Sequence, residues 1–374
     1  MSTLAERMPH TVALTNALGT GILITTPQPI PDAIATRIRS FVTEYESTLS
    51  RFRNDSTVAA MGVAEHGGHF DFPQWAAALF DCYDLLSAVT ECAIDPCVGE
   101  DLTRLGYGAD MQFTMQPGAE GQLGSLHGRP TWQHDVTRQG NQGTTLVTQR
   151  AVHLDFGACG KGYCVDMISS LLRSEFVIDF VIDAGGDLLV QSDSPITIAL
   201  EDPSNSANAV GVAHVTRGAF CASAPSRRRW RSGGGQVELH HLLNAIDGMP
   251  AREVRATWVY SAGVTPVKTT NATPATPATL DTPAALDTPT PLATPATPTA
   301  VASSMSDSTD NPSQRVTYPT AIADGLATAL FVTDPNRLAN ALGDIPFQCA
   351  LLRHTTAGMQ AAASTGFPGE FFTS

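Results

Sequence analysis

Apolar side chains recur every three or four residues in two long segments near the start of the chain. The first segment runs from residue 31 to 49, and Pro31 suits its first turn. Its apolar positions are Ile34, Ile38, Val42, Tyr45 and Leu49. The second segment runs from about residue 73 to 92. Its apolar positions are Trp75, Leu79, Cys82, Leu86 and Val89. This spacing predicts two amphipathic helices whose apolar sides pack into a core.

A different pattern begins near residue 151, where apolar and polar residues alternate. Val152, Leu154 and Phe156 predict a short strand, and the glycine-rich segment GACGKG at 157–162 ends it. Apolar residues then return at helical spacing from Val165 onward. The sequence therefore predicts a strand, a glycine loop and a helix in that order.

Strand patterns dominate the chain after this helix. The segment FVIDFVIDAGGDLLVQ predicts two strands joined at 184–186, because the two glycines there can adopt the positive φ angles of a tight hairpin. Further strand patterns occupy 196–200, 210–215 and 254–260. Helices and strands mix without regular βαβ alternation, so the predicted fold class is α+β.

A stretch of Thr, Pro and Ala repeats precedes the last helical pattern. It covers 265–312 and holds too few large apolar side chains to offset the entropy lost on ordering. Periodic apolar sequence resumes near Tyr318. We therefore predict one large domain, formed by 1–264 and 313–374, with a disordered insertion between its two parts.

Composition and charge limit the classes of function. With 374 residues and 43% hydrophobic content, the chain can bury the core of a globular protein. Its formal net charge of −14 excludes a general nucleic-acid or anionic-membrane binder, because neutralising phosphates requires clustered Lys and Arg. One dense basic run exists, for which a solvated loop is favoured over an anion pocket. Its members are Arg227, Arg228, Arg229 and Arg231.

The location of the protein is predicted from its termini and its cysteines. The first residues lack a basic stretch followed by an apolar core, so no signal peptide is expected. No run of roughly 18 apolar residues predicts a membrane anchor. The seven cysteines are odd in number and form no CxxC pair, which favours reduced thiols over disulfides or a zinc site. These features predict a cytoplasmic protein.

The glycine loop at 157–162 is a candidate phosphate site. Lys161 lies at the predicted helix start, where free backbone N–H groups and the helix dipole attract anions. The spacing does not match the Walker A pattern. A tight structural turn is the alternative interpretation.

The last helical pattern, TAIADGLATALFV at 320–332, offers two oxygen ligands. Asp324 and Thr328 are four residues apart and therefore share one face of the helix. A carboxylate, a hydroxyl, water and substrate phosphates are ligands that Mg²⁺ accepts. A solvated helix face is the alternative interpretation.

Two adjacent histidines, His240 and His241, lie in a strand pattern that leads to an Asp-Gly turn. Neighbouring side chains on a strand point to opposite sides, so at most one of the two faces a site. That residue is a candidate general base near neutral pH. A hydrogen-bonded structural histidine is the alternative interpretation.

Taken in order, these motifs resemble the ApbE family, the FAD:protein FMN transferases. The matching stretches are LGT at 18–20, TLSRF at 48–52, AIDPCVG at 93–99, LGYG at 105–108, LDFGACGKGYCVD at 154–166, IDAGGDL at 182–188, HHLL at 240–243 and ADGLATALFV at 323–332. They span nearly all of the chain outside the predicted insertion. The resemblance implies a single mixed α/β domain of the ApbE-like, T-fold-related type.

The resemblance also implies a reaction of the phosphotransferase type. Members of the family bind FAD with Mg²⁺, cleave its pyrophosphate and join FMN through a phosphoester to a Thr or Ser of an acceptor protein, with release of AMP. FAD is then a substrate, and magnesium is the cofactor. The best-known members are exported, whereas a cytosolic acceptor is expected for this chain.

Roles for individual residues follow from the same resemblance. Asp324, Thr328 and the backbone carbonyl of Ala158 would hold the metal. His241 would accept the proton of the acceptor hydroxyl. Leu18 and Phe52 would pack against rings of FAD. The full set of residues expected to contact FAD is Leu18, Phe52, Ala93, Ile94, Asp95, Asp155, Lys161 and Leu242.

The sequence departs from the family pattern around His241. Asn244 and Ala245 stand where the family commonly has Asp-Pro, and Ala222-Ser223-Ala224 stands where it has Thr-Ser-Gly. A carboxylate is lost at the first of these places. Two alternatives to transfer follow: non-catalytic binding of FAD, or a pyrophosphatase that releases FMN and AMP.

Overall fold

A nine-stranded antiparallel sheet organises the part of the chain that the structure describes. This computed structural model describes residues 3–232, 237–263, 318–356 and 358–372. The strand order is β1-β2-β6-β7-β8-β13-β14-β15, and β16 pairs with β8. The strands are β1 (His10–Leu14), β2 (Ile22–Thr26), β6 (Phe180–Asp183), β7 (Asp187–Asp202), β8 (Asn205–Ser223), β13 (Val254–Ser261), β14 (Gln348–Thr355), β15 (Gly358–Ala363) and β16 (Gly369–Phe371).

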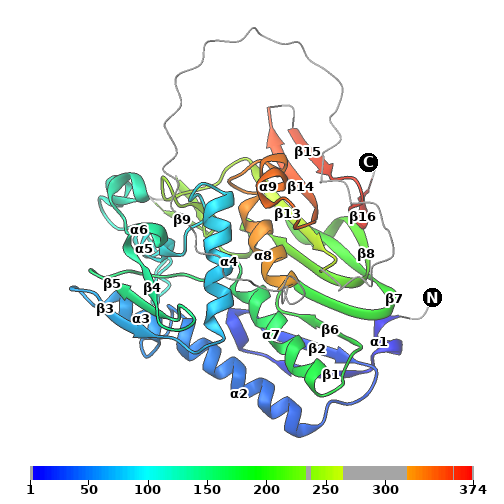
Figure 1. Cartoon of the computed structure of the whole chain (residues 1–374). Coiled ribbons are helices and arrows are strands. Elements are labelled where there is room, and N and C mark those ends of the chain that lie inside the picture. Colours follow the sequence, from blue (N-terminus) through cyan, green and yellow to red (C-terminus); the bar gives the residue numbers. More distant parts are fainter. Residues whose placement is uncertain (1–2, 233–236, 264–317, 357, 373–374) are drawn as a thin grey trace.

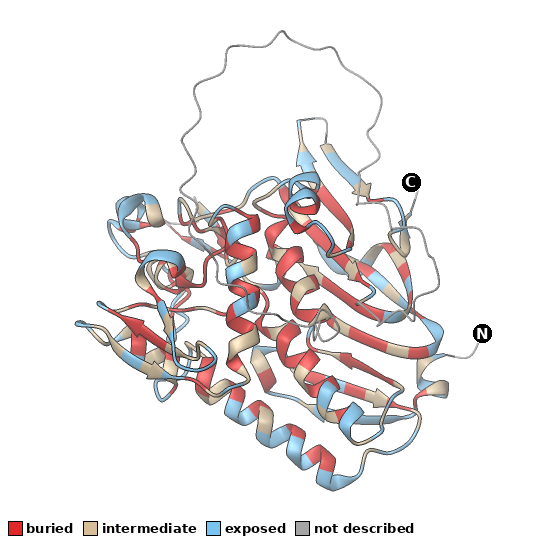
Figure 2. Cartoon of the chain, viewed as in Figure 1, coloured by how far each residue is buried: buried red, intermediate tan, exposed pale blue. Residues whose placement is uncertain are grey.

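Four helices cover one face of this sheet (Figure 1). They are α2 (Asp32–Leu49), α4 (Ala76–Val89), α7 (Gly160–Ser174) and α8 (Pro319–Ala329). Helices α7 and α8 pack on each other, while α2 packs on α7 and α4 packs on α8. The sides that these helices turn toward the sheet and toward one another are buried (Figure 2). The candidate site residues that lie on α7 and α8 are therefore held between two packed layers.

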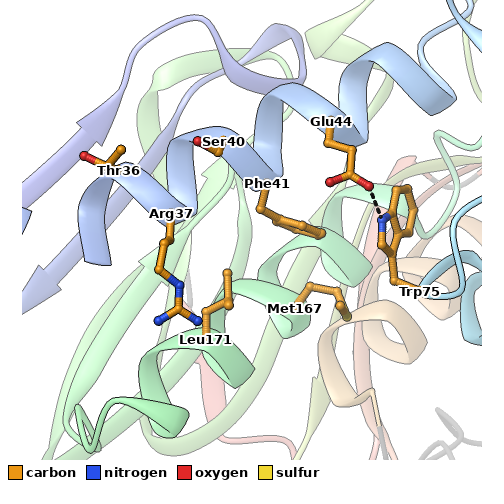
Figure 3. A pocket seen from close by; sticks show the side chains of 8 residues that line it. All are labelled: Thr36, Arg37, Ser40, Phe41, Glu44, Trp75, Met167 and Leu171. Carbon is orange, nitrogen blue, oxygen red and sulfur yellow. Dashed lines mark hydrogen bonds between the residues drawn. The ribbon is translucent and has the colours of Figure 1, made fainter. Parts of the chain in front are cut away.

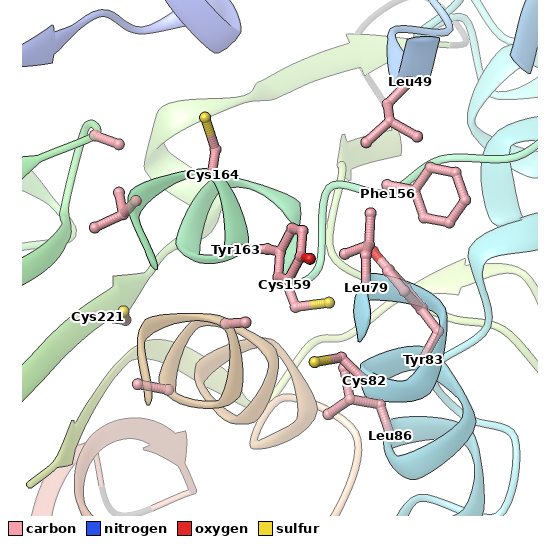
Figure 4. Packing of buried hydrophobic residues seen from close by; sticks show 14 of the residues in the cluster. Leu49, Leu79, Cys82, Tyr83, Leu86, Phe156, Cys159, Tyr163, Cys164 and Cys221 are labelled. Atoms are coloured by element: carbon pink, nitrogen blue, oxygen red, sulfur yellow. The ribbon is translucent and has the colours of Figure 1, made fainter. Parts of the chain in front are cut away.

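The main core lies where α4, α7 and α8 meet (Figure 4). Leu79, Cys82 and Leu86 of α4 are buried there beside Phe156 and Cys159. All seven cysteines are unpaired, and all but the half-buried Cys92 are buried. Six of the seven cysteines therefore serve as small core residues.

Periodicity identified the long helices correctly. The segment predicted as a helix over 31–49 is α2, which begins directly after Pro31. The segment predicted over about 73–92 contains α4, and its Leu79, Leu86 and Val89 are buried as expected. Helix α8 follows the pattern at 320–332. In each case a stripe of apolar residues marks the side of the helix that faces the core.

The Ala-Gly-Gly hairpin is also confirmed. Strands β6 and β7 pair antiparallel, and Ala184, Gly185 and Gly186 join them. The φ angles of Gly185 and Gly186 are +71° and +107°, which side chains rarely tolerate. The pattern predicted at 196–200 is not a separate strand but the second half of β7.

The strand predicted over Val152, Leu154 and Phe156 is wrong, because 151–156 has no regular secondary structure. All three apolar side chains are buried, which explains the alternation. Their backbone bonds to loops instead of a strand: Val152 N–H donates to Met61 O at 3.3 Å, and Asp155 N–H donates to Pro96 O at 2.6 Å. The alternation of apolar residues in 151–156 therefore reflects burial of one side of the segment, which pairs with no described strand.

Smaller elements form the remainder of the described fold. The short helices are α1 (Leu4–Arg7), α3 (Thr57–Gly62), α5 (Gly99–Arg104), α6 (Trp132–Asp135) and α9 (Pro335–Leu342). The 3₁₀ turns are η1 (Ala17–Gly19), η2 (Pro96–Val98), η3 (Ala119–Gln122), η4 (Ser125–His127) and η5 (Pro225–Arg227). The small sheets pair β3 (Gly68–Asp71), β5 (Thr145–Thr148) and β4 (Thr137–Gln139); β9 (Arg229–Ser232) and β10 (Val237–His240); and β11 (Leu243–Asn244) and β12 (Met249–Pro250).

Helices and antiparallel strands together confirm the α+β class. The predicted insertion at 265–312 lies outside the described residues, so the domain limits around it stay a prediction. Within the described ranges, we find no helix with both the length and the apolar character needed to cross a bilayer.

Candidate active site

The candidate site is centred on a lysine held between two buried carboxylates. Lys161 lies in the first turn of α7, Asp187 begins β7, and Asp324 lies in the middle of α8. The Lys161 ammonium forms an ion pair with Asp187 and lies 3.3 Å from Asp324 Oδ1. Both carboxylate side chains are only 1% exposed. We call Lys161, Asp187 and Asp324 the lysine centre.

Burial controls the charges of the lysine centre. It raises the pKa of Asp324, Asp187 raises that pKa further, and Lys161 opposes both effects. Burial likewise raises the pKa of Asp187, again against the attraction of Lys161. Burial alone would lower the pKa of Lys161, but the two carboxylates raise it overall. The lysine therefore stays charged, and with both carboxylates ionised the centre carries one excess negative charge.

Helices α7 and α8 are joined at this point by direct backbone contacts. Gly162 N–H donates to Asp324 Oδ2 at 2.9 Å. A Cβ at Gly162 would lie 2.2 Å from the Thr320 carbonyl oxygen, so only glycine fits this crossing. Four residues later in α7, Asp166 accepts from the N–H groups of Thr320 at 3.0 Å and Ala321 at 2.9 Å. Asp166 thus caps the start of α8 and fixes where Asp324 lies.

Oxygen atoms that suit a hard cation lie beside the lysine centre. Thr328, one turn beyond Asp324, has its Oγ1 3.4 Å from the carbonyl oxygen of Ala158. Asp187 Oδ1 is buried and has no hydrogen-bond partner. Carboxylate, hydroxyl and carbonyl oxygens form a donor set that fits Mg²⁺. No group of three or more His, Cys, Asp or Glu in the described ranges could hold a metal, so a cation here would depend on this mixed set.

Asp155 and Phe52 are linked through Arg51. The Arg51 guanidinium forms an ion pair with Asp155 and donates to Tyr107 O at 2.7 Å. It also lies over the Phe52 ring, 4.1 Å from the ring centroid. Asp155 Oδ1 accepts from Gly157 N–H at 2.7 Å, which shapes the glycine loop. Phe52 itself is 37% exposed, so its ring is available to stack with a ligand.

The two histidines take different partners. His240 ends β10 and bonds to Ala251 O through Nε2 at 2.7 Å. His241 follows the strand, and its Nδ1 lies 3.3 Å from Arg228 O. Because a carbonyl can only accept, Nδ1 carries the proton and Nε2 is left as an acceptor.

The environment of His241 keeps its ring neutral. Burial lowers the pKa of His241 to about 4, although the hydrogen bond to Arg228 O opposes the decrease. Asp155 and Lys161 lie close enough to influence the same ring electrostatically. His241 is therefore uncharged at pH 7 and lies within electrostatic range of Asp155 and Lys161.

The LGT segment forms a strained turn at the edge of this region. Leu18 has a φ angle of 54°, and its N–H donates to Glu46 Oε1 at 3.0 Å. Thr20 packs against the Ala-Gly-Gly hairpin so closely that a Cβ at Gly185 would lie 2.7 Å from Thr20 Cβ. Leu18 is partly buried and the segment is otherwise exposed.

Four of the residues expected to contact FAD are buried behind the site. Asp95 accepts from the backbone N–H of Cys97 at 2.7 Å and of Trp132 at 3.1 Å. Leu242 packs with Val254 and Phe331. The other two are Ala93 and Ile94, both 4% exposed. Ala93 O accepts from Ala245 N–H at 2.9 Å, so this segment supports the turn after His241, and direct contact with FAD stays a prediction.

The departures from the family pattern are accommodated locally. Asn244 Oδ1 accepts from Ile246 N–H at 3.0 Å and so holds the turn between β11 and β12. Ala224 has a φ angle of −151° and ψ of 142°, an extended conformation that needs no glycine. Neither change introduces backbone strain next to His241.

Sequence reasoning missed Asp187, Arg51 and Asp166 as parts of the site. Asp187 directly follows the Ala-Gly-Gly hairpin, and Arg51 lies inside the TLSRF motif, so both were within reach of the motifs. The hairpin was interpreted only as a turn. Pairing Asp187 with Lys161 requires the placement of α7 on β7, which no local pattern contains.

Two hollows on the surface lie away from this site. One, of about 350 Å³, opens between α2 and α7 and holds a hydrogen bond from Trp75 to Glu44 (Figure 3). It is lined by Thr36, Arg37, Ser40, Phe41, Glu44, Trp75, Met167 and Leu171. The other, of about 450 Å³, is lined by charges of both signs, among them Glu100, Arg104 and Arg129. Neither hollow is lined by the lysine centre or by His241. The candidate site is therefore identified by the chemistry of its side chains and not by a cavity.

Comparison with known proteins places most of the chain in one family. Residues 18–273 match the ApbE family. The proteins named FAD:protein FMN transferase in Klebsiella pneumoniae and Vibrio cholerae are 24% and 22% identical over 59% and 58% of this chain. The matches cover 67% and 65% of those relatives, about two thirds of their length. A relative of the same name in Rhodobacter capsulatus is 27% identical, with 55% of this chain and 39% of the relative covered.

Solved structures show the same fold. The ApbE protein of Thermotoga maritima superposes with a TM-score of 0.68 at 18% identity, covering 96% of this chain and 98% of that one. The flavin transferase ApbE of Vibrio cholerae gives a TM-score of 0.67 at 17% identity, with 96% and 97% covered. The arrangement of sheet and helices described above is therefore one that those proteins share.

Proposed function

The chain belongs to the ApbE family, and from this premise we propose that it is an FAD:protein FMN transferase. In this proposal it cleaves FAD and joins FMN to a Thr or Ser hydroxyl of an acceptor protein, with release of AMP. One observation carries the proposal: Lys161 contacts Asp324, the oxygen donors Thr328, one turn beyond it, and Ala158 lie together, and the neutral His241 is within electrostatic range of Lys161. The names of the curated relatives support the same activity.

The proposed reaction exchanges one phosphate bond for another. The hydroxyl oxygen attacks the phosphorus that carries the riboflavin part of FAD, and the bond from that phosphorus to the bridging oxygen breaks. The bridging oxygen leaves with AMP, and the hydroxyl proton passes to His241 Nε2. The products are an FMN phosphoester of the acceptor and AMP. Positioning and charge stabilisation supply most of the catalysis in such transfers.

His241 suits the role of general base in this reaction. Its lowered pKa of about 4 leaves the ring neutral, and the Arg228 carbonyl holds the proton on Nδ1. A hydrogen-bonded imidazole with one free nitrogen can take the hydroxyl proton as the new bond forms. Protonation of His241 would remove this capacity.

Asp324, Thr328 and the Ala158 carbonyl would hold Mg²⁺ in the proposed enzyme. When bound, the ion offsets negative charge on the phosphates during transfer. Lys161 keeps Asp324 in place through their contact and stays charged beside the phosphates. Phe52, with its ring held by Arg51, would stack against a ring of FAD.

We further propose that the enzyme acts in the cytoplasm on a cytosolic acceptor. Seven unpaired thiols favour a reducing compartment.

The test is to incubate the purified protein with FAD, MgCl₂ and a peptide library in which each member carries an Asp and a Thr or Ser. We expect AMP, measured by chromatography, and peptides with covalent flavin, measured by mass spectrometry. A reaction with excess EDTA is the control and should yield neither product. AMP without labelled peptide would indicate hydrolysis, and bound FAD without AMP would indicate a binding protein.

A further inference from the structure

The arginine run at the edge of the site contains residues with different surroundings. Arg227 forms an ion pair with Glu201 at 2.6 Å, and Arg231 lies 3.9 Å from Glu238. Their side chains are 62% and 71% exposed. Arg229 is also exposed and flanks the buried Trp230 on β9, as Arg231 does. These three arginines are solvated as predicted, but Arg229 and Arg231 lie on strand β9 and not in a loop.

Arg228 is instead half-buried, and among the described residues its side chain bonds to backbone carbonyls and to no carboxylate. Its Nη2 donates to Gly19 O at 3.0 Å, and its Nη1 donates to Arg227 O at 3.0 Å. Across the described ranges no carboxylate lies within ion-pair distance of this guanidinium. Two carbonyls satisfy two of its five N–H groups and leave its positive charge unneutralised.

The position of Arg228 links two parts of the candidate site. Its side chain holds the LGT turn, whose Thr20 packs on the Ala-Gly-Gly hairpin. Its own carbonyl accepts from His241 Nδ1. Arg228 therefore contacts the turn expected to bind FAD through its guanidinium, and the residue expected to take the acceptor proton through its backbone carbonyl.

The other cations of the site are already neutralised. Arg51 pairs with Asp155, and Lys161 is shared by Asp187 and Asp324. A bound pyrophosphate would bring negative charge to a region whose lysine is already shared by two carboxylates. An unpaired guanidinium with spare N–H groups in fork geometry is the side chain best suited to meet it.

We propose that Arg228 binds the pyrophosphate of FAD directly, through the N–H groups that the two carbonyls leave unused. The inference rests on the proposed function and assigns to this chain a phosphate contact that its motifs do not contain. Arg228 is then a substrate-binding residue that also secures the turn beside it.

The test compares Arg228→Ala and Arg228→Lys with Arg229→Ala as the matched control. Arg229→Ala removes the same charge from the neighbouring residue, which faces solvent. Dissociation constants are measured by calorimetry for three probes in MgCl₂: FAD, riboflavin, which has no phosphate, and inorganic pyrophosphate, which has no flavin. Thermal melting of each variant reports folding.

We expect Arg228→Ala to weaken FAD and pyrophosphate binding by roughly 10-fold or more and to leave riboflavin binding within about 2-fold, because a hydrogen bond to a charged group is lost. Arg228→Lys should recover part of the loss, and Arg229→Ala should match the wild type. Equal weakening of FAD and riboflavin would overturn the inference, since Arg228 would then act only by holding the LGT turn. Unchanged pyrophosphate binding in a folded Arg228→Ala would overturn it as well. A wild-type protein that binds pyrophosphate but neither flavin would instead count against the proposed function.

Discussion

The lysine centre and the rim of the candidate site are built in different ways. The lysine centre stands on α7, α8 and the first residue of β7, and its two carboxylates are 1% exposed. The rim, which we define as Leu18, Phe52 and Arg228, lies on turns and segment ends and is partly exposed. Packed regular elements hold the first set, whereas one or two polar or ring contacts hold each residue of the second.

This difference suggests separate roles: the lysine centre serves the reaction, and the rim serves the binding of FAD. Charges fixed by a helix crossing such as Gly162 against Thr320 cannot move without repacking the core. Rim contacts such as Arg228 to Gly19 can change with little effect on the fold. We therefore expect changes in the lysine centre to remove catalysis or stability, and changes in the rim to alter the affinity for FAD.

The largest effect is expected at Asp324. Asp324→Asn keeps the shape of the side chain but removes the carboxylate proposed to hold the cation, so the rate of FMN transfer should fall by about 100- to 1,000-fold. Binding of Mn²⁺, followed by its electron paramagnetic resonance signal, should weaken in parallel.

Asp193→Asn is the matched control for that change. Asp193 also lies on a regular element, β7, but its side chain is 81% exposed and pairs only with Arg217. Wild-type Mn²⁺ affinity in Asp324→Asn would show that the cation does not bind there.

A second prediction concerns the helix crossing. In Gly162→Ala the added Cβ would lie 2.2 Å from Thr320 O, so α7 and α8 must separate. We expect the free energy of unfolding to fall by about 1–3 kcal/mol, as for other overpacked sites, measured by urea denaturation. Gly121→Ala is the control, because no atom lies within 4 Å of a Cβ there. Equal stability of the two variants would mean that the crossing is looser than described.

A third prediction uses the lowered pKa of His241. The ring should be neutral down to a pH of about 4, so kcat/KM at saturating Mg²⁺ should show no loss from this residue between pH 8 and 5. Below its pKa the rate should fall about tenfold per pH unit. An acid limb near 6.5 that disappears in His241→Asn would mean that the ring is solvated.

The same shift has a consequence for stability. The folded pKa of His241 lies below the ordinary value of about 6.5 for a histidine in an unfolded chain. At His241 the unfolded chain therefore binds more protons than the folded chain, so the free energy of unfolding decreases as the pH falls. The stabilising contribution of the neutral ring is complete above a pH of about 6.5 and is lost as the pH falls toward 4.

The smallest effect is expected at Phe52. Phe52→Ala removes an aromatic ring that is 37% exposed, so FAD affinity should decrease roughly 2- to 10-fold while the melting temperature stays near that of the wild type. Phe176→Ala is the control, since that ring is 90% exposed. Loss of stability in Phe52→Ala would place the ring in the core and not in the rim.

The sequence was most informative where side chains repeat with the period of an element. The stripes of α2 and α4 and the pair Asp324 and Thr328 were predicted because burial on one helix face imposes a regular spacing. The order of short motifs indicated the family and, with it, Lys161 and His241. The solvated-face interpretation of Asp324 was wrong, since the residue is 1% exposed.

Other features depend on contacts that no local pattern records. Alternation at Val152, Leu154 and Phe156 predicted a strand, but burial against loops produces the same pattern. The pairing of Asp187 with Lys161 and the contact of Arg228 with Gly19 join residues far apart in the chain. Such contacts arise from the way the sheet and helices are placed on each other.

The ratio of AMP released to FMN joined to a hydroxyl acceptor tests the central claim most directly. Both are measured in the same reaction, AMP by chromatography and the acceptor by intact mass, for the wild type and for Asp324→Asn. We expect one AMP for each flavinylated acceptor with the wild-type protein and neither product with Asp324→Asn. AMP released at the same rate with and without acceptor, and no covalent flavin, would contradict the assignment of this protein as a transferase.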